Sequence, residues 1–229
     1  MSETAILNQP VAEVAAALPG APAVLRGSAI DYRRGGAATL ADAARAAGAD
    51  PQAVAASLLA AARDGKAVPP ALLRTPDLVA HVLERFHEGH RADLRDILPL
   101  AEKVERVHAG HPACPTGLRA LLRVVEAELD QHMRKEEEIL FPLLLRGSAA
   151  FLAGPIHCMG LEHDAFEELL VELERTAGGC VPPADACGTW RTLYARLGRF
   201  VDEAREHMHL ENDVLFPRFA RAADGELEG

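Results

Sequence analysis

The chain has 229 residues, 49% of them hydrophobic, which is enough for one large core and a smaller second domain. Its 34 acidic and 24 basic residues give a net charge of −10, which argues against nucleic acid or an anionic membrane as a partner. No apolar run of about 18 residues and no basic leader at Met1 are present, so we expect a cytoplasmic protein without a membrane span.

Residues 1–66 predict a small N-terminal helical domain. This part is rich in alanine, and its short helical runs are interrupted by glycine and proline. Thr39, with Asp42 three residues later, predicts a helix start, and Gly48 predicts the end of that helix. The segment 65–70, Gly-Lys-Ala-Val-Pro-Pro, predicts a linker.

Residues 75–222 predict a second domain made of four long helices. Thr75-Pro76-Asp77 has the cap, the proline and the acid that are typical of a helix start. The four helices are expected near residues 76–108, 115–146, 155–177 and 185–222. Short glycine- and proline-containing connections favour an up-down-up-down four-helix bundle, so the predicted fold is all-α. We expect Pro99, Pro142 and Pro217 to kink or stop their helices.

An eleven-residue phrase occurs twice in this second domain, 75 positions apart. It begins at His132 and again at His207, and six of its eleven positions are identical. Each copy has a glutamate four residues after the histidine, Glu136 and Glu211, followed by Leu-Phe-Pro. Because residues four apart lie one turn apart on one helix face, each copy predicts an imidazole beside a carboxylate.

The repeated His and Glu interrupt apolar stripes that we expect to face the core. Steps of three and four residues through the two copies give Leu118, Leu122, Val125, Leu129, His132, Glu136, Ile139, Leu143 and Trp190, Leu193, Leu197, Phe200, Ala204, His207, Glu211, Val214. A buried carboxylate needs a cationic partner, since desolvating an unpaired charge is very costly. A metal ion is the partner that fits best, and a metal-free interaction bundle is disfavoured.

The other two helices also offer inward histidines. His163 is the polar member of the third stripe, and His87 and His90 share one side of the first helix. A single such histidine is more often a core or rim residue than a ligand, but here all four helices have one. Imidazole suits iron, zinc or copper, and shared carboxylates suit two ions about 3.5–4 Å apart.

These residues resemble a hemerythrin-like di-iron domain, and more narrowly the bacterial repair-of-iron-centres proteins. Residues 8–60 also resemble the small N-terminal domain of that family, through Ile30-Asp31-Tyr32, Gly35-Gly36 and Thr39-Leu40. The resemblance implies two non-haem iron ions, with oxo and carboxylate bridges. It assigns their ligands to His87, His132, Glu136, His163, His207 and Glu211.

The resemblance also implies a role in nitrosative and oxidative stress. The irons would bind nitric oxide or dioxygen, could reduce nitric oxide, and would support repair of damaged iron–sulfur proteins. The alternative is a non-enzymatic gas or redox sensor or carrier. The family usually has a Cys-Cys pair where this chain has Arg33-Arg34. Arginine is neither a soft ligand nor a nucleophile, which argues against a thiol-dependent transfer there.

Several other polar residues are secondary candidates. Glu128 and Glu162 could act as outer acids or proton donors near the metals, although a solvated helix face is the competing interpretation. His108 is a possible alternate ligand, and His90 is expected at a polar rim. We expect solvent exposure for the remaining candidates, which are Glu137, Glu138, His81, His111, His157 and His209. The four cysteines are expected to be reduced, with Cys180 and Cys187 able to pair on oxidation.

Overall fold

The computed structural model describes residues 3–18, 20–28, 30, 32, 37–64, 70–147 and 152–219 of the chain. These residues form helices joined by turns, and the predicted all-α class is confirmed. The chain divides into two compact units, Met1–Arg74 and Thr75–Gly229. No helix among the described residues is long and apolar enough to cross a membrane.

The first unit is a small bundle of short helices. They are α1 (Glu3–Leu7), α2 (Val11–Ala17), α3 (Ala21–Gly27), α4 (Leu40–Ala46) and α5 (Pro51–Asp64), followed by the 3₁₀ turn η1 (Pro70–Leu72). Their apolar side chains form one core, in which Val11, Leu25, Tyr32, Leu40 and Leu58 are at most 1% exposed.

The predicted start and end of α4 are confirmed. Thr39 is the N-cap: its Oγ1 accepts a hydrogen bond from the backbone N–H of Asp42 at 3.2 Å and donates one to the Asp42 carboxylate at 2.8 Å. These bonds satisfy a free amide at the helix start. Gly48 follows the helix with φ of +72°, a conformation that suits glycine. The pair Arg33-Arg34 and the linker residues 65–69 lie outside the described residues.

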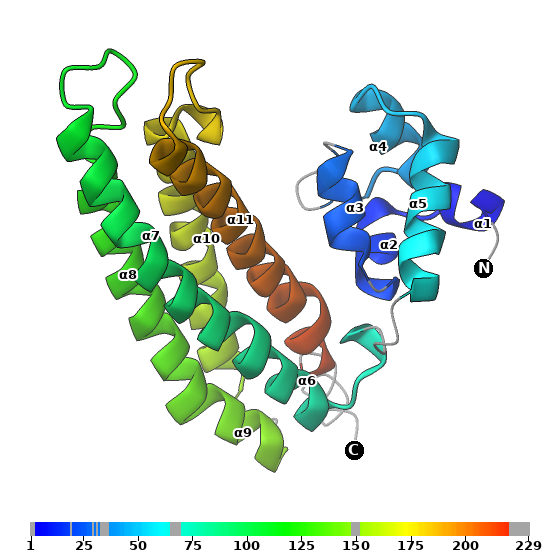
Figure 1. Ribbon diagram of the computed structural model, residues 1–229. Coiled ribbons are helices and arrows are strands. Elements are labelled where there is room, and N and C mark those ends of the chain that lie inside the picture. The colour runs from blue at the N-terminus through cyan, green and yellow to red at the C-terminus, as the bar shows by residue number, and fades with distance from the viewer. Residues whose placement is uncertain are drawn as a thin grey trace, which may run out of the picture. The chain divides into compact units, whose positions relative to one another are not determined.

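The second unit is the predicted four-helix bundle. Its helical segments are α6 (Thr75–His81), η2 (Val82–His87), α7 (Glu88–Val107), α8 (Leu118–Lys135), η3 (Glu136–Leu140), α9 (Phe141–Arg146), α10 (Ala153–Thr176), the 3₁₀ turn η5 (Gly178–Cys180), α11 (Gly188–Leu210) and η6 (Glu211–Leu215). Helix α7 packs against α8 and α11, and α10 packs against the same two helices (Figure 1). The core between them is lined by the expected stripe residues, including Leu122, Val125, Leu193 and Leu197.

Three of the four long helices contain a π-helical segment, η2, η3 and η6. In η6, the Phe216 N–H donates to the Glu211 carbonyl at 2.8 Å, a bond that spans five residues instead of four. A π turn adds one residue, so every later side chain moves to a neighbouring face. The predicted stripe is therefore wrong beyond Glu136: Ile139 is 55% exposed, whereas Leu140 and Leu144 are buried.

The three prolines behave differently from one another. Pro142 and Pro217 lie just after η3 and η6, where the regular hydrogen-bond pattern is already interrupted, in line with the expected breaks. Pro99 does not stop its helix: α7 continues through this proline to Val107.

We expect a fragment that begins at Thr75 to fold and to bind metal without the first unit. All six predicted ligands lie in the second unit, which has its own hydrophobic core. Circular dichroism and metal analysis of this fragment should give the helical content of a folded bundle and the metal content of the full chain. Metal content far below that of the full chain would show that the first unit contributes to the site.

Candidate metal centre

The six residues that the sequence predicts as ligands meet inside the bundle. They come from η2 (His87), α8 (His132), η3 (Glu136), α10 (His163), α11 (His207) and η6 (Glu211). All six are buried, and both carboxylates are 0% exposed. Two of the three π segments begin with a glutamate of the site, so the irregular turns lie where the helices supply their carboxylates.

The six residues form two overlapping groups. One contains His87 and His207, the other contains His132 and His163, and both include Glu136 and Glu211. Within each group, the potential ligand atoms lie within 4.8 Å of one another. Two four-residue groups that share two carboxylates could hold two metal ions with the carboxylates between them.

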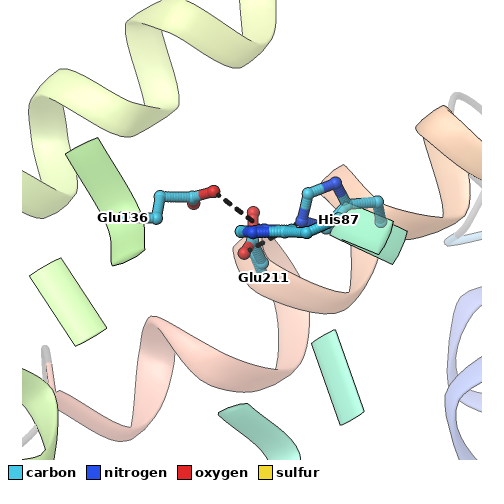
Figure 2. Close-up of side chains that lie close together, drawn as sticks. His87, Glu136 and Glu211 are labelled. Carbon is cyan, nitrogen blue, oxygen red and sulfur yellow. Dashed lines mark ion pairs between the residues drawn. The ribbon is translucent and has the colours of Figure 1, made fainter. Parts of the chain in front are cut away.

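Each carboxylate is approached by two imidazoles through Nε2. The Nε2-to-oxygen distances are 3.3 Å for His87 to Glu136, 3.4 Å for His132 to Glu136, 3.3 Å for His163 to Glu211 and 3.2 Å for His207 to Glu211. Figure 2 shows the His87 ring and the two carboxylates turned toward one another.

Six inner atoms of this centre lack hydrogen-bond partners among the described residues. They are the four oxygens of Glu136 and Glu211, and Nε2 of His87 and of His207. Nε2 of His132 and Nε2 of His163 lie 3.0 Å from each other. Buried polar atoms are nearly always paired, and an unpaired buried charge costs several kcal/mol. A cation among these atoms would accept lone pairs from both residue types, so the donor set fits a metal ion.

Without a metal, the pKa values of the two carboxyl groups shift in opposite directions. Burial, together with the charge of Glu211, raises the pKa of Glu136 to about 8. Burial also opposes ionisation of Glu211, but His207 and His163 outweigh it and hold the pKa of that carboxyl well below its usual range. The metal-free pair therefore retains one proton near neutral pH, and a bound cation would displace that proton.

The outer nitrogens of three of these imidazoles are held by side-chain oxygens. The Nδ1-to-oxygen distances are 2.7 Å for His87 to Glu137, 3.0 Å for His132 to Glu162 and 2.8 Å for His163 to Asn212. Such contacts fix the ring and its tautomer, so that Nε2 is free to bind a metal, as is usual for metal-ligating histidines.

Glu137 and Asn212 were not predicted as part of the site. Glu137 was expected to be solvated, but its carboxylate contacts Nδ1 of His87 and forms an ion pair with Arg91 at 2.9 Å. Both residues directly follow a glutamate of the site, at the same position of the repeated phrase. Their shared position in the repeat could have indicated a shared role. A regular helix, however, would turn both side chains away from the core, so the helical pattern did not predict their contacts with the histidines.

The Leu-Phe-Pro ending of the repeated phrase also has a structural role. Phe141 stacks on His87 with ring centroids 5.7 Å apart, and Phe216 stacks on His163 at 6.0 Å. The equivalent phenylalanine of each copy thus packs on a histidine from another helix. This packing restricts the orientation of the two rings.

A cavity of about 320 Å³ reaches the centre from one side. It is lined by His132, His163 and His207, by Glu128, Lys135 and Glu162, and by apolar side chains that include Leu129, Phe166 and Met208. Glu162 accepts a hydrogen bond from Lys135 at 2.6 Å, and the bonds from Lys135 and His132 keep the pKa of Glu162 below its usual range despite partial burial.

His90 was expected at a polar rim, but it is only 1% exposed, so this expectation is wrong. Its ring lies 5.4 Å from that of His207 and 5.6 Å from that of Phe200. Burial, followed by the nearby His207, lowers its pKa well below the usual value. His90 thus packs behind a predicted ligand as a neutral ring.

His108 is not brought to the metal centre. It follows His87 by about six helical turns, roughly 30 Å along the bundle. Its Nε2 lies 3.2 Å from the sulfur of Cys187. The expectation of an alternate ligand is therefore wrong for this centre.

The remaining histidines are mostly where the sequence placed them, near the surface. His157 is exposed, while His81 and His111 are half-buried. The His209 side chain is only 9% exposed and lies 2.7 Å from the carboxylate of Asp213, so its expected exposure is wrong.

Comparison with known proteins agrees with this architecture. Residues 78–219 match the hemerythrin HHE cation binding domain, and residues 7–62 match ScdA_N, a domain of unknown function. The chain is 39% identical over 216 residues to the iron-sulfur cluster repair protein YtfE of Citrobacter koseri, covering 92% of this chain and 96% of that protein. It is also 39% identical over 220 residues to the proteins of the same name from Yersinia pseudotuberculosis and Yersinia pestis, covering 93% of this chain and 97% of each relative. The chain therefore belongs to the hemerythrin HHE family, in the group of iron-sulfur cluster repair proteins that combine this domain with an N-terminal ScdA_N domain.

Proposed function

We propose that the chain is a cytoplasmic non-haem di-iron protein that binds nitric oxide and supports the repair of damaged iron–sulfur clusters. The observation that carries this proposal is the pair of buried carboxylates, each between two imidazoles, with four oxygens that have no other partner among the described residues. The proposed ligands are His87, His132, Glu136, His163, His207 and Glu211. When bound, two iron ions would supply electrons and open coordination positions for a diatomic gas.

The cavity beside His132 and His163 is the proposed route for that gas. Its apolar walls suit a small, weakly polar molecule, and it is lined by three of the proposed ligands. On the other side of the centre, Phe86 stacks on His207 at 5.1 Å, and His90 packs against the same ring. These side chains would keep water away from that side.

Glu162 and Glu128 are the proposed proton carriers of the cavity. Reduction of two nitric oxide molecules to nitrous oxide consumes two protons as well as two electrons. Glu162 lies between Lys135 and Nδ1 of His132, and Glu128 lines the same cavity. Glu162 would also hold His132 in the tautomer that leaves Nε2 free for a metal.

The alternative is a hemerythrin-type gas or redox sensor or carrier that binds the same ligand without turnover. Metal analysis and the visible spectrum before and after nitric oxide test the di-iron proposal, since two irons per chain and a nitric oxide-dependent spectrum are expected. Anaerobic assay of nitrous oxide, with a chemical reductant, then separates the two functions. Binding without any nitrous oxide would favour the carrier.

The pair Arg33-Arg34 provides a test of the repair function. Because guanidinium cannot act as a soft, exchangeable ligand, we expect this chain to bind nitric oxide at the bundle but to restore damaged clusters slowly. Changing both arginines to cysteine should raise the rate of cluster repair and leave the resting iron spectrum unchanged.

The matched control for this pair changes both arginines to serine, which removes the positive charges without adding thiols. Repair should be measured anaerobically with one nitric oxide-damaged iron–sulfur protein as the client. Equal repair rates for the cysteine, serine and arginine forms would mean that the pair is dispensable.

A further inference from the structure

A second cluster of reactive side chains lies in the bundle, at the end opposite to the metal centre. Cys187 and His108 are in contact there, with His108 Nε2 at 3.2 Å from the sulfur. Trp190 is buried beneath them: its ring lies 4.8 Å from that of His108 and 5.3 Å from that of His111. The indole ring also packs edge-on against Tyr194, with ring centroids 6.0 Å apart.

The pair lies where the ends of two helices meet. Cys187 is the N-cap residue of the 23-residue helix α11, and its side chain makes no capping hydrogen bond. His108 is the C-cap residue of α7, and its N–H donates to the Val104 carbonyl. The fold therefore brings the sulfur and the imidazole together from positions 79 residues apart in the chain.

The other three cysteines have different surroundings. Burial raises the pKa of the Cys180 thiol to about 11, and Glu174 and Asp202 act in the same direction. Cys158 is exposed, but its sulfur lies 3.5 Å from a carboxylate oxygen of Glu162. Cys114 is half-buried and lies 3.9 Å from the Glu105 carbonyl. Cys187 is partly exposed and is the one cysteine among the described residues with an imidazole at hydrogen-bond distance.

We propose that Cys187, with His108 as its base, is a modification site that undergoes exchange with low-molecular-weight disulfides. The thiol proton passes to His108 as the Cys187 sulfur attacks one sulfur of the disulfide. A new S–S bond forms and the old one breaks, and the other half leaves as a thiolate that takes the proton back from His108. No net electron is gained or lost, so the step needs only the disulfide as co-reactant.

The test uses the full-length, metal-loaded protein, with oxidised glutathione as the disulfide. Peptide mass spectrometry measures the rate of mixed-disulfide formation at each cysteine at pH 7. Cys187 should react first, ahead of the more exposed Cys158. Faster reaction at Cys158 or at Cys114 would overturn the proposal, and this result does not depend on any variant.

Two variants then test whether Cys187 reacts fast because His108 acts as its base or only because its sulfur is exposed. His108→Gln should slow the reaction of Cys187 at pH 7 at least about fivefold, since a positioned base is lost. The matched control is His111→Gln, because His111 packs on the same Trp190 but contacts Asp185 instead of a thiol. Its rate should stay within about twofold of the original chain, by the same argument.

Near pH 10 a thiol ionises without a base, so the rates of the His108→Gln variant and the original chain should converge there. An unchanged rate for His108→Gln at pH 7, or a deficit that persists at pH 10, would overturn the role of His108. The metal content of both variants should equal that of the original chain, since neither residue lies at the metal centre.

Discussion

Glu136→Gln and Glu211→Gln should each bind metal at least about a hundredfold more weakly than the original chain, and each should retain at most one iron. Glutamine keeps the size of the side chain but removes the charge that both metal sites share, since both groups of ligands include both carboxylates. Iron content after dialysis against a weak chelator, together with the visible spectrum, is the measurement. Glu138→Gln is the matched control for Glu136→Gln, because Glu138 lies in the same π segment as Glu136 but is exposed, and it should retain the original metal content.

Two outcomes of this experiment would be informative. If both glutamine variants still bound nearly two irons, the shared-carboxylate assignment would be wrong. If Glu138→Gln lost metal to the same degree, the loss would reflect damage to the π segment and not the removal of a ligand.

Chelation of the metal should make the stability of the protein strongly dependent on pH. The folded-state pKa of Glu136 is raised to about 8, from 4.5 for an ordinary glutamate. Between these values the folded state binds more protons than the unfolded state, so stability falls as pH rises and levels off above about 8. Glu211 has a lowered pKa, so its contribution changes only at acidic pH.

The best window for this measurement is pH 6.5 to 8. The pKa of His90 is lowered in the folded state, so its contribution to the free energy of unfolding increases with pH only up to about 6.5, the ordinary pKa of histidine. Above pH 6.5 His90 therefore does not oppose the effect of Glu136. We expect the free energy of unfolding of the metal-free protein to fall by about 2 kcal/mol across the window. Urea unfolding of the chelated protein at several pH values measures this change.

Glu136→Gln provides the comparison for the pH effect. Without the titrating carboxylate, the metal-free variant should show a nearly flat profile over the window, and at pH 8 it should be more stable than the metal-free original chain. The reason is that the variant no longer buries a charge that lacks its cation. A metal-free original chain with equal stability at pH 6.5 and pH 8 would contradict the raised pKa of Glu136.

The local pattern of the sequence was sufficient to predict the helical class, the four long segments of the bundle and the inward histidines and glutamates. The choice of six ligands among them, with His87 instead of His90, came from the family resemblance. The helix repeat brings His132 beside Glu136 and His207 beside Glu211 whatever the rest of the fold does, because four residues make about one turn. An apolar stripe interrupted by these residues also points them into the core. The ligation of iron by the six residues stays a prediction for metal analysis to test.

Only the tertiary structure could decide what depends on the π segments and on contacts between helices. The π turn at Glu136 moves Ile139 to the surface and Leu140 into the core, and a regular helical repeat has no means of anticipating the extra residue. Glu137 holds His87 across 50 positions of sequence, and His108 reaches Cys187 across 79. Pairings of this kind arise from the side-by-side packing of helices that are distant in the chain, so the spacing of residues within one helix does not contain them.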